Sequence, residues 1–333
     1  MTSFDLEIDA SGTVPVRAIP DLARRAEAAG LGGVWKGETS NRDPIAVLAA
    51  CAPATERIAL GSAIVHMLAR SPVATAMAAA TLATLSEGRF ILGIGVANPT
   101  LAGWHGGRFE RPLAMARDYL TIVRQTYAGE RVAHSGRAFS ARDFRLGGSV
   151  PSWPLRILLA ALGPRMSALA GELADGVLVN MATPAAIREI TGWMREGALA
   201  AGRDPDLLEV AVKVRVVITD DLAAGRNALR PTVAAYCRAP GYQELLIRSG
   251  FGADLARIEA AWTGGGFGAA IRAVDDAMLD QLPAFVLPSA AALPGLLREY
   301  VEAGATRVLI PVIPAGLDPV AETVRFIETF PDS

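Results

Sequence analysis

The sequence predicts an α/β fold, a single (β/α)₈ TIM barrel over residues 1–333. Short β-branched runs alternate with amphipathic helical stretches along the whole chain, and about eight such runs can be counted, the number of strands that the barrel requires. Hydrophobic residues make up 51% of the chain and charged residues 20%, as expected where parallel strands are buried on both faces. A doubly wound sheet is the alternative, but no linker or change of composition divides the chain into halves.

The first strand is expected at 4–8, and a helix near 16–29 follows it and ends at Gly30 as its C-cap. Later strands are expected where β-branched and apolar residues cluster, at 33–36, 58–65, 90–96, 156–162, 176–180, 210–219 and 307–312. Two of the helices between them begin with an N-cap residue followed by proline, at Asp43-Pro44 and Ser71-Pro72.

Two segments break the regular spacing and are interpreted as insertions. Residues 130–153, after the fourth helix, are polar and glycine-rich and predict a small hairpin beside the barrel mouth. Residues 220–287, between the seventh and eighth strands, predict several helices with a flexible break at 263–267. We call residues 220–287 the extension, and we expect it to cover the mouth or to contact a partner subunit.

Charge and cysteine content restrict the partners and the compartment. The net charge of −2 and the isoelectric point near 6.0 provide no broad basic surface for nucleic acid or membrane lipid, so a small-molecule partner is expected. The N-terminus is acidic where a signal peptide would be basic, and the longest apolar run, 71–85, ends at charged residues. Cys51 and Cys237 fit no disulfide or metal spacing. We therefore expect a cytoplasmic protein.

Polar residues directly after the strands are the first candidate site residues, because barrel enzymes carry their chemistry on these loops. Glu38 and Thr39 follow the second strand, and for them ligand contact and an ordinary solvated loop stay open. His66 follows the third strand, where Gly61 indicates a bulge or a close approach to a ligand; a structural histidine is the other interpretation. Asn180 ends the sixth strand and is expected to face the mouth.

The fourth strand ends in Gly93-x-Gly95. A Rossmann site is not expected there, because the third glycine is missing and no helix is expected directly after Ala97-Asn98. We interpret the two glycines as one wall of a ligand pocket, with tight barrel packing as the alternative. Trp104-His105 follows on a glycine-flanked loop and predicts either a wall of the substrate site or a surface tryptophan packed against the extension.

After the fifth strand, Gly163-Pro164 starts a helix with Arg165 beside its free N–H groups. Such a helix start suits a phosphate or another anion, although an ordinary turn is the alternative. No cluster of His, Asp or Glu has metal-ligand spacing, and no G-x-S-x-G elbow or serine, histidine and acid arrangement is present. Neither a metal site nor a hydrolase is predicted.

Three segments carry a resemblance to a known family: LSEGRFILGIG at 85–95, AALGPRM at 160–166 and LAGELADG at 169–176. With them the sequence resembles the bacterial luciferase-like monooxygenase superfamily, especially its branch that uses the deazaflavin coenzyme F420. The match spans nearly the whole chain. The resemblance implies a (β/α)₈ barrel that binds a flavin-like ring at the C-terminal mouth, commonly as a homodimer.

The resemblance also implies cofactor contacts. A non-prolyl cis peptide bond in the bulge of the third strand, at Ala63-Ile64, would back the ring, and Glu38 and Thr39 would approach its polar edge. The other implied contacts are Ser62 and His66 beside the bulge, Gly95, Ala97 and Asn98 across the ring, and Ala161, Leu162, Gly163, Pro164, Arg165 and Met166 at the ribityl and phosphate portion.

Thr39 and Asn98 stand where the F420-dependent sugar-phosphate dehydrogenases carry a catalytic histidine and a glutamate, so oxidation of a sugar alcohol is not expected. A reductase supplied with reduced F420 needs only a proton after the hydride. The expected proton donors are Glu38, His66, His105 or water, and the expected substrate contacts are Thr39, Trp104, His105 and Asn180. A monooxygenase that uses reduced FMN and oxygen is the alternative, and a barrel without catalysis is a third possibility.

Overall fold

The computed structural model describes residues 2–316 and 318–331, and in them eight parallel strand positions close into a barrel. The barrel strands are β1 (Ser3–Glu7), β2 (Gly33–Lys36), β3 (Ala59–Ser62) continued by β4 (Val65–His66), β5 (Phe90–Gly95), β8 (Arg156–Ala160), β9 (Gly176–Asn180), β10 (Glu209–Lys213) and β13 (Arg307–Pro311). The circle closes because β1 pairs with β2 and β13, while β3 pairs with β2 and β5. The predicted barrel is confirmed.

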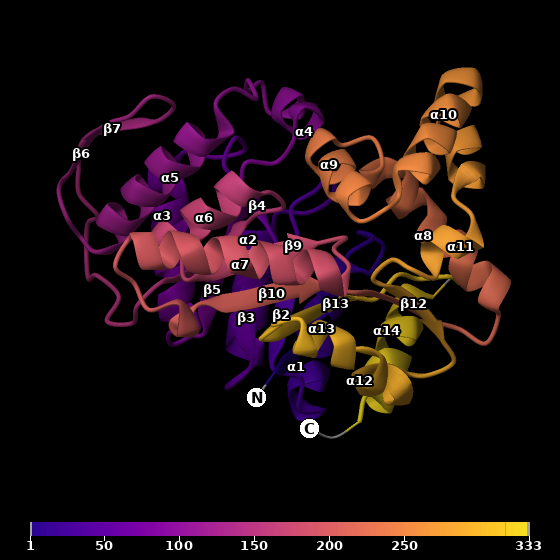
Figure 1. The fold of residues 1–333 in the computed structure, drawn as a ribbon. Helices are drawn as coiled ribbons and strands as arrows, with labels where there is room; N and C mark the ends of the chain where they lie inside the picture. The colour runs from indigo at the N-terminus through magenta and orange to yellow at the C-terminus, as the bar shows by residue number, and fades with distance from the viewer. Residues whose placement is uncertain (1, 317, 332–333) are drawn as a thin grey trace.

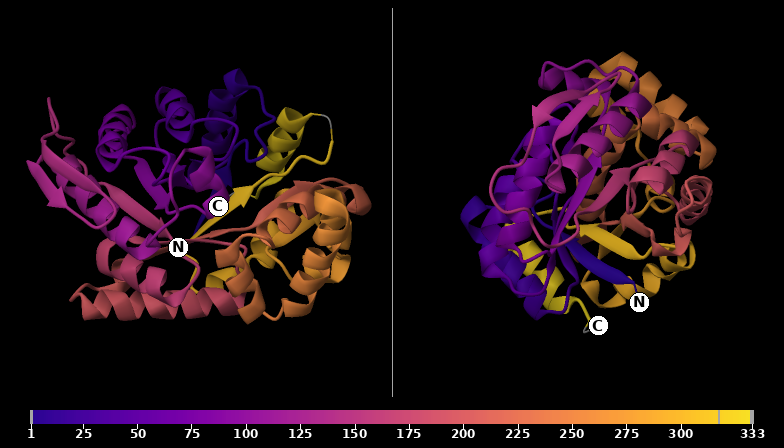
Figure 2. Two further views of the ribbon diagram at one scale, coloured as in Figure 1. Left: turned by 90° about the horizontal axis from the view of Figure 1, so that it is seen from above. Right: turned by 90° about the vertical axis from the view of Figure 1, so that its left-hand side faces the viewer.

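Helices lie outside the strands (Figures 1 and 2). Those of the barrel wall and its loops are α1 (Ile19–Ala28), α2 (Pro44–Cys51), α3 (Pro72–Leu85), α4 (Pro99–Trp104), α5 (Pro112–Tyr127), α6 (Pro164–Leu173), α7 (Pro184–Ala200), α12 (Leu293–Leu296), α13 (Arg298–Glu302) and α14 (Pro319–Thr329), with 3-10 turns at Val16–Ala18, Ala52–Ala54, Pro205–Leu207 and Ala290–Ala292. The side chains of Asp43 and Ser71 accept from the N–H groups of Ala46 and Ala74, which confirms both predicted N-caps.

The expectation that no helix starts after Ala97-Asn98 is wrong. Helix α4 begins at Pro99, and the Asn98 side chain accepts from the N–H of Leu101 at 3.0 Å. The residue types are those of the other two starts, a polar N-cap followed by proline at the first helical position.

The expected strand 210–219 is two strands. Val214, which follows β10, donates to Leu309 O at 2.9 Å, and the chain then leaves the barrel as β11 (Arg215–Ile218). There it pairs in parallel with β12 (Ala284–Leu287), a strand in a segment where helices were expected. A small second sheet therefore joins the last strand of the extension to the residues that precede the extension.

The rest of the extension is helical, as predicted, with α8 (Leu222–Tyr236), α9 (Pro240–Arg248), α10 (Gly252–Ala273) and α11 (Asp276–Leu279). It lies on one side of the barrel (orange in Figure 1). The break expected at 263–267 is narrower than predicted, because only Gly266 departs from helical dihedral angles. In the other insertion, β6 (Val132–Ser135) and β7 (Ser140–Phe144) form the predicted hairpin. His134 Nε2 of the hairpin lies 3.0 Å from Asp118 Oδ1 of α5.

The barrel interior has charged groups at both ends and an apolar middle. At the N-terminal ends of the strands, Arg307 pairs with the buried Asp5 and with Glu209. The middle is filled by apolar side chains, those of Trp35, Ala63, Ile91, Leu158, Leu178, Ala211 and Leu309. At the C-terminal ends, Lys213 pairs with Glu7. In the described chain no helix combines the length and the apolar character needed to span a membrane.

Candidate functional site

The loop after β2 is joined to the third barrel strand through Glu38. Its backbone N–H donates to Ile64 O at 2.9 Å. One oxygen of its buried carboxylate, Oε2, accepts from the backbone N–H of His66 at 2.6 Å, and the other, Oε1, lies 3.0 Å from Arg70 Nη2. Both oxygens of this predicted catalytic group are thus occupied within the protein.

His66 lies at the end of β4 with its ring 5% exposed. Its Nε2 lies 2.8 Å from the carbonyl oxygen of Glu38, and because a carbonyl oxygen only accepts, Nε2 carries the proton. Burial lowers the pKa of His66, which favours the neutral ring. Nδ1 is therefore an acceptor, and it is buried with no hydrogen-bond partner among residues 2–316 and 318–331. A buried acceptor of this kind suits an N–H or O–H group of a ligand.

The peptide bond Ala63-Ile64 between β3 and β4 is cis, as the family resemblance implied. The carbonyl oxygen of Ala63 accepts from Lys213 Nζ. The hydroxyl of Ser62 donates to Gly93 O at 2.8 Å. The bulge is therefore held by a side chain from β10 and by its own Ser62 hydroxyl, which binds the backbone of β5.

Packing accounts for one of the two glycines of β5. A Cβ atom on Gly93 would lie 1.9 Å from Ser62 O, a backbone atom of the bulge, and a distance this short is excluded for a real side chain. A Cβ atom on Gly95 would lie 2.4 Å from Ile64 Cδ1, the end of a side chain that can move. The ligand-pocket wall expected at Gly95 stays a prediction.

Sequence reasoning missed a buried ion pair at the mouth. Lys213 Nζ lies 2.9 and 2.8 Å from the two carboxylate oxygens of Glu7, and both side chains are at most 10% exposed. The signal was available, since each is a charged residue that ends an apolar strand. The two residues are 206 positions apart in the sequence, so no local pattern predicts that they pair.

The N-terminus of α6 has no side-chain cap, in contrast to that of α7, which Thr183 caps. Gly163 is its N-cap and provides no side-chain acceptor, and a Cβ atom there would meet nothing within 4 Å. Pro164 and Arg165 are exposed, whereas Ala161 is buried. The half-buried residues of the same predicted group are Leu162, Gly163 and Met166. The free N–H groups of this helix start are available to an anion.

The extension reaches the mouth at two points. Asn180 Nδ2 at the end of β9 donates to Tyr242 Oη of α9 at 2.8 Å, and Asn180 Oδ1 is buried without a partner. At the other end of α9, Arg248 Nη2 donates to Leu162 O at 2.7 Å. Of the two roles expected for the extension, contact with the mouth is therefore observed.

The remaining predicted residues lie at the rim. Thr39 is exposed. Trp104 is 59% exposed at the end of α4, and the two roles expected for it stay predictions. His105 follows it, exposed, and lies near enough for its charge to contribute to the lowered pKa of His66. Ala97 is half-buried with a positive φ of 63°, and Asn98 uses its side-chain oxygen to cap α4.

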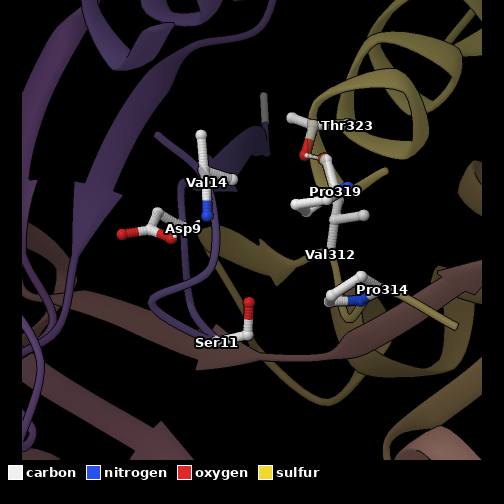
Figure 3. A pocket seen from close by; sticks show the side chains of 7 residues that line it. All are labelled: Asp9, Ser11, Val14, Val312, Pro314, Pro319 and Thr323. Atoms are coloured by element: carbon white, nitrogen blue, oxygen red, sulfur yellow. Dashed lines mark hydrogen bonds between the residues drawn. The ribbon is translucent and has the colours of Figure 1, made fainter. Parts of the chain in front are cut away.

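A narrow crevice with no room for a water-sized molecule lies between the loops after β1 and β13 (Figure 3). Its acidic residue, Asp9, is occupied, because it accepts from Val14 N and Arg42 Nη1, each at 2.9 Å. None of the residues predicted for the site lines it. Among residues 2–316 and 318–331, no three His, Cys, Asp or Glu side chains gather as metal ligands would.

Comparison with known proteins gives one family. The profile of the luciferase-like monooxygenase family matches residues 1–307. The chain is 35% identical over 272 residues to a Mycobacterium tuberculosis protein provisionally named a coenzyme F420-dependent oxidoreductase, with 76% of each chain covered. It is 32% identical to the 5,10-methylenetetrahydromethanopterin reductase of Methanolobus tindarius, with 80% of this chain and 82% of that one covered. The structure of the coenzyme F420-dependent tetrahydromethanopterin reductase of Methanopyrus kandleri matches with a TM-score of 0.81 and 26% identity over 99% of both chains.

Proposed function

The chain belongs to the luciferase-like monooxygenase family, and on that premise we propose that it is an F420-dependent oxidoreductase. We propose the direction of a reductase, with a hydride passing from the reduced coenzyme to a C=C, C=N or C=O bond of a small organic substrate. The observation that carries the proposal is the likeness to an F420-dependent reductase over 99% of both chains.

Two features of the mouth fit a cofactor with a flat ring and a phosphorylated side chain. The uncapped N-terminus of α6, with exposed Arg165 beside it, offers N–H donors and a positive charge to a phosphate. The bare Nδ1 of His66 offers a buried acceptor beside the bulge at Ala63-Ile64. When bound, reduced F420 supplies a hydride from a carbon of its ring.

The protein must then provide a proton and exclude water. Glu38 is a poor candidate donor because Arg70 and the His66 N–H occupy its carboxylate, so we assign it the positioning of the bulge. The ring of His66 carries its proton on Nε2 and donates it in a hydrogen bond to the carbonyl oxygen of Glu38, so it is not available to a substrate. Of the expected donors, His105 and water remain.

Titration with F420 and with FMN tests the proposal. The purified protein is mixed with each compound and the cofactor fluorescence is followed. Binding of F420 without binding of FMN supports the proposal. Binding of FMN alone contradicts it and favours the monooxygenase that uses reduced FMN and oxygen, and binding of neither favours a barrel without catalysis.

We further propose a homodimer that joins through α2 and α3. Neither helix contains a charged residue, although Met77 and Leu85 of α3 are 47% and 49% exposed. A helix that is apolar on all sides is normally covered, and a second copy of the chain would cover this face. Both cysteines are buried and unpaired, which fits the cytoplasmic location that we expect.

A further inference from the structure

Arg215 is a buried cation at the mouth of the barrel. It is the first residue of β11, two positions after Lys213, and it is 4% exposed. Its backbone N–H donates to Pro283 O at 2.9 Å, and its strand pairs with β12. The extension therefore fixes Arg215 beside the C-terminal ends of β9 and β10.

The guanidinium group of Arg215 has weak partners only. Nη1 lies 3.3 Å from the sulfur of Met181, and the group lies 5.1 Å from the ring centroid of Tyr236. No carboxylate within residues 2–316 and 318–331 forms an ion pair with it. By contrast, Arg70 pairs with Glu38 and Asp43.

An unpaired charge in a protein interior costs free energy. A sequence that only had to fold would gain by placing an apolar side chain of similar size at this position. The isolated cation is explained if an anion arrives from outside the chain and pairs with it.

A hydroxyl donor accompanies this cation. The ring of Tyr242 stacks on that of Tyr236 with 4.4 Å between centroids, so Arg215 and Tyr242 flank the same aromatic ring. Because the amide nitrogen of Asn180 donates to Tyr242 Oη, the hydroxyl proton of Tyr242 is free for another acceptor. Tyr242 is half-buried, and its phenol group lies in the interior beside Asn180.

We propose that Arg215 and the hydroxyl of Tyr242 form an anion subsite that binds a carboxylate of the organic substrate, with Asn180 as the positioning residue for Tyr242. The planar guanidinium fork matches a carboxylate. The subsite is separate from the proposed phosphate position, because α6 follows β8 and β9 lies between β8 and β10 in the barrel. The inference rests on the proposed function only in taking this mouth as the substrate site.

The first test uses small carboxylates as probes. Acetate, benzoate and succinate are titrated into the protein by calorimetry at an ionic strength held constant with sodium chloride. We expect Arg215→Met to weaken the best of the three by about 10- to 100-fold, as for the loss of a charge-assisted hydrogen bond. Tyr242→Phe should weaken it less. Arg226→Met, which removes an arginine paired with Asp276 and Asp280, and Tyr236→Phe, which keeps the aromatic stack, should leave it unchanged.

The second test needs no ligand. If the charge of Arg215 serves binding rather than folding, the unfolding temperature of Arg215→Met should equal or exceed that of the wild type. Added carboxylates should raise the unfolding temperature of the wild type and leave that of Arg215→Met unchanged. Equal carboxylate affinities of the wild type and Arg215→Met, or no binding of any probe by the wild type, overturn the subsite. So does a large fall in unfolding temperature in Arg215→Met, provided that Arg215→Lys shows it as well.

Titration of the same variants with F420 separates the two proposals. If Arg215→Met binds F420 as tightly as the wild type does, the carboxylate that Arg215 binds belongs to the substrate and not to the cofactor. An F420 affinity that falls as much as the carboxylate affinity places the anion on the cofactor and overturns the substrate assignment. Carboxylate binding that depends on Arg215, in a protein that does not bind F420, contradicts the proposed function and leaves the subsite standing.

Discussion

Glu38 and His66 are joined by two hydrogen bonds, and His66 is the donor in both. The carboxylate of Glu38 accepts from the backbone N–H of His66 at 2.6 Å, and Nε2 of the His66 ring donates to the backbone carbonyl of Glu38 at 2.8 Å. Each residue thus binds the backbone of the other. The loop after β2 and the end of β4 form one unit.

Replacement of Glu38 by alanine should lower the free energy of unfolding by about 1–3 kcal/mol, because the buried N–H of His66 loses its acceptor. Urea unfolding measures the change. Glu38→Gln retains an oxygen for this N–H and should lose less. A free energy of unfolding of Glu38→Ala equal to that of the wild type would show that the two hydrogen bonds do not stabilise the fold.

Replacement of Lys213 by methionine should cost about 3–5 kcal/mol, because Glu7 is left buried without its counter-charge. The double variant Lys213→Met, Glu7→Gln should regain much of that loss, and denaturant unfolding of the three proteins measures it. The control is Arg131→Met, which breaks an ion pair whose side chains are 69% and 73% exposed and should change stability little. Equal effects at the two sites would contradict the burial argument.

Acid should destabilise the protein through His66. Burial lowers the pKa of His66 in the folded protein below its ordinary value of 6.5, so the unfolded chain binds the proton more readily. Its contribution to stability is present above pH 6.5 and is lost as the pH falls toward the folded pKa. The unfolding temperature of the wild type should therefore fall more steeply between about pH 7 and pH 5 than that of His66→Gln. If the unfolding temperatures of the two proteins change equally with pH, His66 does not contribute to the acid destabilisation.

Replacement of Gly93 by alanine should destabilise the barrel by about 1–3 kcal/mol or more, because the new Cβ meets the backbone of the bulge. Gly192→Ala is the matched control, since Gly192 lies in α7 with nothing within 4 Å of an added Cβ. That variant should gain about 0.5–1 kcal/mol from helix propensity. Thermal unfolding of both proteins decides whether close packing explains Gly93.

Replacement of Met77 by glutamate should convert the proposed homodimer into a monomer, because the substitution buries a charge in the α3 contact. Sedimentation equilibrium measures the mass. Leu207→Glu is the control, since Leu207 is an apolar residue 79% exposed elsewhere, and it should leave the assembly unchanged. A monomeric wild type, or a dimeric Met77→Glu variant, would exclude this interface.

Local patterns predicted the fold well where local chemistry decides it. The helix starts at Asp43 and Ser71 follow from an N-cap side chain and the fixed φ of proline. The start at Asn98 has the same pattern, a polar N-cap followed by proline, although it was not predicted. The cis bond at Ala63-Ile64 was accessible only through family resemblance, since no local pattern distinguishes it.

Long-range pairings could not be predicted from the sequence. The contact of Lys213 with Glu7 joins the first and seventh barrel strands, and its existence depends on closure of the barrel. The departure of the chain at Arg215 depends on the partner strand β12, which lies about seventy positions later along the chain. Tyr242 reaches the mouth only because α9 folds back onto β9.

The separate sheet of β11 and β12 has an evolutionary consequence. β11 still pairs with the chain beyond β13 through Val216 and Val312, and the extension departs after it and returns at β13. The extension can therefore be exchanged between related barrels while the strands that carry His66 and Gly95 stay intact. Exchange of this module would replace Tyr242 without altering the bulge in the third strand. New substrates can thus be acquired by grafting, and chimaeric proteins that swap residues 215–287 offer a route to engineer them.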